Sequence, residues 1–209
     1  MPLSKIVVGT RGSKLALAQT QEVLAQLKRL ARSISPKVVE IKSGGDAMPE
    51  VPLANLGKGI FIKELEVALL QGKIDMAVHS LKDLPVELAE GLSIVVVCQR
   101  QDPRDVLVNK ANCPLSEMEP GAVIGTSSPR RLAQLYALRS DLRVEPIRGN
   151  VETRLNKALG QDYDGVVLAA AGIARLGFES RIAQYLDPWE MVPEPGQGAL
   201  AVEVRSENK

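Results

Sequence analysis

Apolar and polar positions follow two alternating patterns along the chain. Short runs of consecutive apolar, mostly β-branched residues are followed by longer stretches in which apolar positions recur with helical spacing. In the first half these patterns predict strands at Lys5–Val8, Val38–Ile41, Met76–Val78 and Ser93–Cys98, and helices at Lys14–Leu30 and Phe61–Gln71. Continuous apolar strands that alternate with helices are typical of a mostly parallel sheet with helices on both faces. The expected fold class is therefore α/β.

The second half of the chain repeats landmarks of the first half. In both halves a glycine-containing loop follows an apolar run and opens a helix, and a basic turn with glycine comes later. The echoed segments are Gly9–Gln19 and Gly125–Gln134, Gly72–Val78 and Gln161–Val167, and the turns Lys42–Asp46 and Arg148–Asn150. Two copies are too few for a solenoid. The repeat therefore predicts two similar α/β domains that face each other.

Two polar, proline-containing breaks mark the expected domain boundaries. The first is Gln99–Asp105, and the second is Pro193–Gly198, which another apolar strand, Ala199–Val204, follows. We expect that strand to return to the first domain. Domain 1 would then comprise residues 1–97 and 196–209, and domain 2 would comprise residues 98–195. Two crossings make a hinge, and clefts between α/β domains are common ligand sites.

Composition excludes several classes of protein. Lys and Arg number 26 against 25 Asp and Glu, and aromatic residues are 3%, which argues against a nucleic-acid binder. Apolar runs are too short for a membrane span, and the run Ile6–Val8 is too short for a secretory signal peptide. The two cysteines, Cys98 and Cys113, form no disulfide framework or zinc motif, so we expect a cytoplasmic protein without a metal site.

The Gly9 and Gly125 loops are candidate anion sites. Each places backbone N–H groups and Ser or Thr hydroxyls at a helix N-terminus, where unpaired donors and the helix dipole favour negative charge. The alternative is ordinary capping of the two helices by Ser13 and Ser128.

Arginines are concentrated after Ser128, and their planar guanidinium groups suit carboxylates and phosphates. Arg130 and Arg131 would lie in the first turn of a helix, where a cation opposes the dipole unless an anion arrives. The alternative is that these arginines are solvated and paired with surface Asp or Glu.

A polar segment, His79–Pro85, follows the predicted strand Met76–Val78. Strand carboxyl ends face the ligand crevice of open α/β sheets, so Asp83 beside Lys82 is a candidate for proton transfer. An exposed ion pair in a turn is the alternative. We interpret His79 as a hydrogen-bonded structural residue rather than a general base. The glycine loop before Phe61 is expected to be mobile and to offer that ring as an apolar face.

Taken together, these segments resemble the porphobilinogen deaminase family, also called hydroxymethylbilane synthase. They occur in the family's order across essentially the whole chain. The matching segments are Gly9–Gln19, Gly57–Glu66, Ile74–Pro85, Asp102–Asp105, Gly125–Arg131, Arg148–Arg154, Tyr163–Gly177 and Pro195–Glu203. Within these segments, Pro129 stands where the family commonly has leucine.

The resemblance implies a fold and an activity. The fold would be two domains like those of periplasmic binding proteins, with mixed, mostly parallel sheets, followed by a small third domain. The activity would be that of a monomeric transferase of tetrapyrrole and heme biosynthesis, which joins four porphobilinogen molecules into hydroxymethylbilane and releases ammonia. The product grows on a dipyrromethane cofactor, which a cysteine of the third domain holds covalently.

The resemblance also implies roles for particular residues. The catalytic carboxylate would be Asp83. The residues that would bind the cofactor are Lys82, Asp83, Thr126, Ser127, Ser128, Arg130, Arg131, Arg148, Gly149 and Arg154. The residues that would bind substrate are Arg11, Ser13, Gln19, Phe61, Arg148, Arg154, Arg175 and Gln197. Each added pyrrole brings two carboxylates, which agrees with the arginines and helix N-termini found from the residues themselves.

Three hypotheses remain at this point. The first is a porphobilinogen deaminase, either a two-domain form or a piece of a longer enzyme. The chain ends at Lys209, where the family continues, and neither cysteine lies in the family's Gly-Gly-Cys context, so we expect no covalent dipyrromethane and no sustained turnover by this chain alone. The second hypothesis is a non-catalytic two-domain module that binds a small carboxylate or phosphate. A third, the effector-sensing domain of a transcription regulator, lacks a helix-turn-helix segment.

Overall fold

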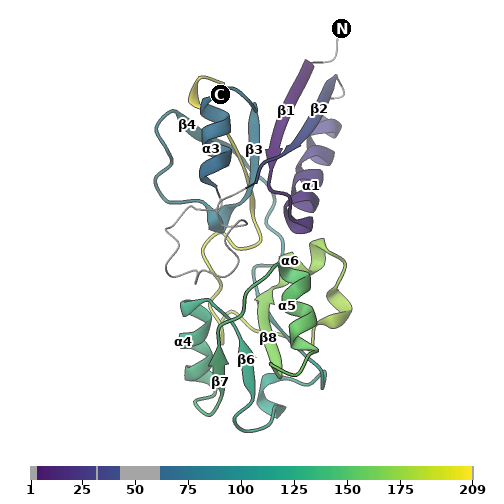
Figure 1. Cartoon of the computed structure of the whole chain (residues 1–209), viewed down its shortest axis with the longest axis vertical. Coiled ribbons are helices and arrows are strands. Elements are labelled where there is room, and N and C mark those ends of the chain that lie inside the picture. Colours follow the sequence, from purple (N-terminus) through teal and green to yellow (C-terminus); the bar gives the residue numbers. More distant parts are fainter. Residues whose placement is uncertain (1–3, 32, 43–61, 209) are drawn as a thin grey trace. The chain divides into compact units, whose positions relative to one another are not determined.

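The protein divides into two compact units in a computed structural model that describes residues 4–31, 33–42 and 62–208. Unit 1 comprises residues 1–100 and 199–209, and unit 2 comprises residues 101–198. The chain therefore passes from one unit to the other twice (Figure 1). The domain boundaries expected from the sequence lie close to these limits, and as domain boundaries they stay a prediction.

Unit 1 is a five-stranded mixed sheet with the strand order β2-β1-β3-β10-β4. β1 pairs in parallel with β2 and β3, whereas β10 is antiparallel to β3 and β4. The elements of unit 1 are β1 (Ser4–Thr10), α1 (Lys14–Leu30), β2 (Ile34–Glu40), α3 (Lys63–Leu70), β3 (Met76–Ser80), the 3₁₀ turn η2 (Leu81–Asp83), β4 (Leu92–Val97), β10 (Leu200–Arg205) and the 3₁₀ turn η5 (Ser206–Asn208).

Helices cover both faces of this sheet (Figure 1). On one face, Val23 and Leu24 of α1 pack with apolar residues of β1, β3 and β10. On the other face, Leu65 and Leu69 of α3 pack against Ala77 and their neighbours. Because both faces are covered, the strands are apolar on both sides, which explains the continuous apolar runs in the sequence.

Unit 2 has the same pattern of strand pairing. Its strand order is β7-β6-β8-β5-β9, in which β6 is parallel to β7 and β8, and β5 is antiparallel to β8 and β9. The elements of unit 2 are β5 (Asp105–Asn109), η3 (Leu115–Glu117), β6 (Val123–Gly125), α4 (Pro129–Leu138), β7 (Arg143–Glu145), α5 (Val151–Ala158), β8 (Gly165–Ala169), α6 (Ala170–Arg175), η4 (Glu179–Arg181) and β9 (Gln184–Tyr185).

The second sheet is also covered on both faces. Leu135 of α4 packs with Leu107 and Ile124 on one side, and Leu155 of α5 packs with Val106 and Val166 on the other. The two units are thus built alike, as the repeated landmarks in the sequence predicted.

Several elements match the sequence expectations closely. The helix at Lys14–Leu30 is confirmed, and the last strand does return to unit 1, as β10. The strand expected at Val38–Ile41 begins earlier, at Ile34, because β2 pairs with β1 along its whole length. Pro36 is tolerated there because β2 is an edge strand, where one row of N–H groups needs no partner.

Candidate functional site

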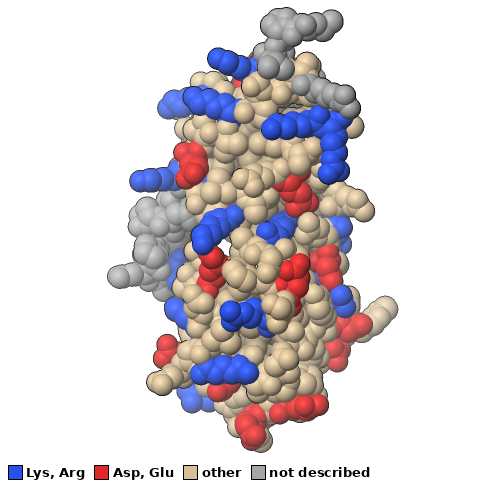
Figure 2. Space-filling view, turned by 90° about the vertical axis from the view of Figure 1, so that its right-hand side faces the viewer, with Lys and Arg blue, Asp and Glu red and all other residues tan. Residues whose placement is uncertain are grey.

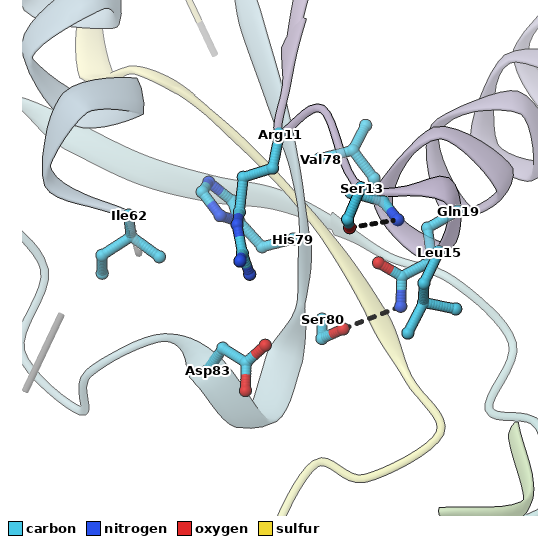
Figure 3. Close-up of a pocket in the computed structure, with 10 residues that line it drawn as sticks. Arg11, Ser13, Leu15, Gln19, Ile62, Val78, His79, Ser80 and Asp83 are labelled. Carbon is cyan, nitrogen blue, oxygen red and sulfur yellow. Dashed lines mark hydrogen bonds between the residues drawn. The ribbon is translucent and has the colours of Figure 1, made fainter. Parts of the chain in front are cut away.

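A pocket of unit 1 lies where the ends of β1 and β3 meet the start of α1 (Figure 3). β1 and β3 are parallel, so their carboxyl ends lie at the same edge of the sheet. The pocket is lined by Arg11, Ser13, Leu15, Ala16, Gln19, Ile62, Val78, His79, Ser80 and Asp83. It brings together four residues that the sequence predicted as substrate-binding or catalytic: Arg11, Ser13, Gln19 and Asp83.

The N-terminus of α1 forms one wall of this pocket. Ser13 caps the helix, and its hydroxyl oxygen accepts a hydrogen bond from the backbone N–H of Ala16 at 3.2 Å. Gln19, one turn further on, is buried and donates its amide N–H to the Ser80 hydroxyl at 2.8 Å. This bond ties α1 to the end of β3. Ser13 thus both caps α1 and lines the pocket.

Arg11 and Asp83 lie on opposite sides of the pocket opening. In Figure 3 the guanidinium group of Arg11 points toward the carboxylate of Asp83. Asp83 is exposed at the end of the η2 turn, which is tied to the sheet by a bond of 3.0 Å from the Leu81 N–H to the Ala199 carbonyl. A cation and a carboxylate at one opening can bind a ligand that carries both an acidic and a basic group.

The only histidine of the chain lies on the pocket wall and is hydrogen-bonded to a fully buried residue. Nε2 of His79 is 2.9 Å from Oε2 of Glu203 on β10, and both residues are buried. His79 therefore has a hydrogen-bonded partner, as the sequence interpretation required. The partner itself was not foreseen, because Glu203 lies within a run that otherwise looks like an apolar strand.

A second carboxyl group lies near this pair. Glu66 is half-buried on α3, and its pKa is raised, first by burial and then by the negative charge of Glu203, whereas His79 opposes the shift. The three groups on α3, β3 and β10 thus form one electrostatic cluster behind the pocket.

In unit 2 a buried carboxylate occupies the corresponding antiparallel strand. Asp105 begins β5 and is fully buried. Its Oδ1 accepts from Arg131 at 2.7 and 3.1 Å and from Gln197 at 2.8 Å, and its Oδ2 accepts from Arg130 at 2.8 Å. The pKa of Asp105 is lowered, because the two arginines and Gln197 outweigh the burial that raises it.

This network shows which anion accompanies Arg130 and Arg131 at the start of α4. The anion belongs to the chain itself, and Arg130 also binds Glu194 at 2.9 Å. Arg131 is buried, so the alternative of a solvated surface arginine is wrong for that residue. The sequence interpretation missed Asp105 because it placed the residue in a polar break, although the residue opens a strand.

The hydroxyl groups of the loop before α4 form hydrogen bonds with backbone groups of the same unit. Thr126 accepts from the Ser128 N–H at 3.2 Å, and Ser127 donates to the Ile147 carbonyl at 2.7 Å. Ser128 caps α4 by accepting from the Arg131 N–H at 3.4 Å, and Pro129 takes the first helical position, which suits its fixed φ. Capping of α4 by Ser128 is therefore confirmed, whereas the anion site at this loop stays a prediction.

Another part of unit 2 gathers positive charge. Arg154 donates from Nε to the Gly149 carbonyl at 2.8 Å. Its pKa is lowered, first by burial and then by the positive charges of Arg131 and Arg148. Arg148 and Arg154 are half-buried, and like charges held close together with reduced access to solvent are costly, so this cluster suits a ligand that brings negative charge.

Two further residues of the predicted site, Arg175 and Gln197, lie outside the unit 1 pocket. Arg175 donates to the Gly198 carbonyl at 3.0 Å, and Gln197 is fully buried with its amide on Asp105 and the Pro103 carbonyl. Phe61 lies outside the described residues. The roles of these three in substrate binding stay predictions.

Other features of the described residues concern metals, membranes and surface charge. No group of three or more His, Cys, Asp or Glu able to hold a metal ion occurs within 4–31, 33–42 and 62–208. In the same part of the chain, no helix is both long and apolar enough to cross a membrane. Acidic and basic side chains are interspersed on the face shown in Figure 2, as expected from nearly equal numbers of the two.

Solved structures share the fold. A methionine-binding protein, MetQ, has a TM-score of 0.59 at 12% identity, with 98% of this chain and 84% of that chain covered. A periplasmic substrate-binding protein of an ABC transporter from Coxiella burnetii has a TM-score of 0.56 at 15% identity, with 97% and 86% covered. The chain thus has two α/β units like those of periplasmic binding proteins.

Sequence comparisons are more specific. The family model described as porphobilinogen deaminase, dipyromethane cofactor binding domain, matches residues 6–209. Porphobilinogen deaminases are 53% identical in Geobacillus kaustophilus, with 99% of this chain and 67% of the relative covered, and 54% identical in Thermus thermophilus, with 96% and 65% covered. The chain spans about two thirds of the length of these relatives. The chain belongs to the porphobilinogen deaminase family.

Proposed function

We propose that this chain carries the reaction pocket and the cofactor-binding residues of a hydroxymethylbilane synthase. The enzyme joins four porphobilinogen molecules head to tail and releases ammonia. The observation that carries the proposal is the unit 1 pocket, in which Arg11 points toward Asp83 beside the capped start of α1. Porphobilinogen has two carboxylates and an aminomethyl group, so it needs both kinds of partner.

Asp83 is the catalytic carboxylate in this proposal. In each addition the C–N bond of the aminomethyl group breaks, ammonia leaves, and the methylene carbon bonds to a carbon of the acceptor pyrrole, which loses a proton. Positive charge develops on the pyrrole as ammonia departs. A carboxylate in place before the reaction stabilises that charge and can accept or pass on the proton. Arg11 and the N–H groups at the start of α1 would hold the carboxylates of the substrate.

The residues of unit 2 fit a dipyrromethane cofactor, which bears several carboxylates. Arg154 is a desolvated cation close to Arg131 and Arg148, so an added carboxylate would relieve the repulsion among them. When bound, dipyrromethane supplies the pyrrole to which the first substrate is joined. Arg148, Arg154 and the loop at Thr126–Ser128 would orient its carboxylates. Cys98 is buried and Cys113 is half-buried, and we propose that neither holds the cofactor.

The direct test is Asp83→Asn in an enzyme of full family length that contains these 209 residues. Substrate binding should persist, whereas ammonia release should fall about 10²–10⁴-fold, because an amide cannot balance the developing charge. Glu87→Gln is the matched control, since Glu87 is an exposed carboxylate a few residues away and does not line the pocket. Near-normal turnover by Asp83→Asn with its cofactor intact would overturn the assignment.

A non-catalytic module that binds a small carboxylate is the second candidate. It is favoured by the resemblance of the fold to substrate-binding proteins and by the cationic cluster at Arg154. The two candidates differ in one measurement. The enzyme of family length should release ammonia from porphobilinogen, whereas a binding module would take up the ligand without ammonia release.

A further inference from the structure

The buried pair of His79 and Glu203 takes no part in the mechanism above, although it adjoins the pocket. His79 lines the pocket together with Arg11 and Asp83, and Glu203 is fully buried behind it. In the described part of the chain the ring makes one hydrogen bond, from Nε2 to Glu203. The pair thus connects the pocket wall with the interior of the sheet.

Glu203 is an unusual residue for its position. Its strand pairs on both sides, with Ala77 of β3 and Ile94 of β4. Its second oxygen, Oε1, is buried and has no hydrogen-bond partner among the described residues. A buried carboxylate oxygen without a partner is costly, and an apolar side chain would fill the same place at less cost. His79 is the hydrogen-bond partner that gives this carboxylate a role.

The two nitrogens of an imidazole have different roles, and a partner on one of them settles the role of the other. An ionised carboxylate can only accept a hydrogen bond, so Nε2 carries the proton when Glu203 is ionised. In a neutral ring Nδ1 is then an acceptor. Because Nε2 is taken by a fully buried partner, Nδ1 is the ring nitrogen left for the pocket.

We propose that Glu203 is a positioning residue that holds His79 through Nε2, so that the ring offers Nδ1 to the pocket as an acceptor for an N–H group of the ligand. The proposal deepens the proposed function and rests on it for the identity of that ligand. Arg11 would bind an acidic group, Asp83 would face the developing positive charge, and His79 would select a pyrrole or amino N–H. Glu66 adds a second carboxyl to the cluster but makes no hydrogen bond to the ring.

The single histidine makes the proposal testable on the 209-residue chain itself. In a long-range nitrogen–proton NMR spectrum of protein with labelled histidine, the two ring nitrogens belong to His79 alone. The expected spectrum of the neutral ring shows a protonated Nε2 and an unprotonated Nδ1. Addition of porphobilinogen should shift the Nδ1 resonance more than that of Nε2. A ring with its proton on Nδ1 would overturn the proposal.

Three variants separate positioning from general stability. Glu203→Met removes the acceptor, so the proton should redistribute between the ring nitrogens and the affinity for porphobilinogen should fall about five- to tenfold, as for the loss of one hydrogen bond. Glu203→Gln keeps a carbonyl acceptor and should restore both the wild-type spectrum and the affinity. Glu66→Met removes the neighbouring carboxyl without removing the hydrogen bond to the ring, so the ring proton should stay on Nε2.

The outcomes also separate this proposal from the proposed function. If Glu66→Met and Glu203→Met change the ring spectrum alike, or if Glu203→Met changes neither spectrum nor affinity, positioning by Glu203 is wrong. If the spectra follow the expectation and acetate perturbs the pocket but porphobilinogen does not bind, the proposed substrate is wrong and the positioning stands. If Glu203→Met fails to fold, the comparison of Glu203→Gln with wild type still decides, since a displaced ring proton in that variant contradicts the proposal.

Discussion

The two units repeat one pattern of strand pairing, yet the buried carboxylate of each unit differs in how many of its oxygens are hydrogen-bonded. Each sheet has a strand that runs antiparallel between two neighbours, and that strand carries one fully buried acidic residue. On β5 of unit 2, both oxygens of Asp105 are bound, by two arginines and Gln197. On β10 of unit 1, Glu203 has one partner, His79, and its other oxygen has none among the described residues.

The difference indicates what each carboxylate contributes. A fully satisfied polar network makes a structure rigid and specific, whereas a partly satisfied one persists where function requires it. Asp105 holds Arg130 and Arg131 at the start of α4 and also binds Gln197. Glu203 contributes less to the stability of its unit and instead orients the His79 ring on the pocket wall. The shared architecture therefore includes a unit in which the buried carboxylate is fully bound and a unit in which it lies behind the candidate pocket.

The largest expected effect is at Asp105. Asp105→Asn leaves the buried Arg131 and the half-buried Arg130 facing an amide, so the free energy of unfolding should fall by about 4–5 kcal/mol. Glu203→Gln keeps its single hydrogen bond and should lower it by about 1 kcal/mol or less. Urea denaturation of both variants measures the contrast. Equal losses would remove the distinction between the two carboxylates.

The two arginines that share Asp105 should also differ. Arg131→Met breaks a buried pair and should cost about 3 kcal/mol of unfolding free energy. Arg130→Met should cost about 1 kcal/mol, because the Arg130 side chain is 20% exposed and one of its two acidic partners, Glu194, is 44% exposed. Denaturant unfolding of the two variants is the measurement, and a larger loss for Arg130→Met would contradict the network as described.

Part of this structure could be predicted from the sequence. The helix at Lys14–Leu30, the caps Ser13 and Ser128, and the returning last strand all follow from local patterns, and each is found in the structure. The partners of the two acidic residues could not be predicted, because Glu203 and His79 are 124 residues apart and Gln197 and Asp105 are 92 apart. Only tertiary pairing brings such residues together.

One sequence signal could have pointed to both acidic partners. Asp105 and Glu203 are acidic residues at or within apolar runs that form strands buried on both sides. Acidic residues are almost never fully buried unless they are paired. An acidic residue in such a run therefore predicts a buried partner, although it does not say which residue that partner is.

The dependence of stability on pH should have opposite signs in the two units. The pKa of Asp105 is lowered, so its contribution is present above the unfolded value of 3.8 and is lost as pH falls through the lower folded value. The pKa of Glu66 is raised, so its contribution is present below the unfolded value of 4.5 and is lost as pH rises through the higher folded value.

Hydrogen exchange of amides in each sheet checks this prediction unit by unit. Protection of β5 and β8 should fall as the solution is made more acidic than about pH 4. Protection of β3 and β10 should fall as pH rises above the same region. Asp105→Asn should abolish the first dependence, and Glu66→Gln should abolish the second. Dependences of the same sign in both units would contradict the assigned shifts.

The smallest contrast concerns the two helix caps. Ser13→Ala and Ser128→Ala should each lower the free energy of unfolding by about 1 kcal/mol, because each leaves an N–H group of the first turn without its acceptor. The bond of Ser128 is longer, at 3.4 Å against 3.2 Å, so the loss should be no greater there. Ser→Asn at the same positions should restore most of the stability, and a failure to do so would mean that capping is not what these hydroxyl groups contribute.

Porphobilinogen is proposed to bind at the unit 1 pocket, beside Arg11 and Asp83. Backbone amide NMR of the 209-residue chain during titration with porphobilinogen can locate the ligand. The largest shifts should map to the start of α1 and to residues 79–83, and Asp83→Asn should retain the shifts at the start of α1. Shifts confined to other parts of unit 1, with these two segments unchanged at saturation, would mean that porphobilinogen does not bind at this pocket.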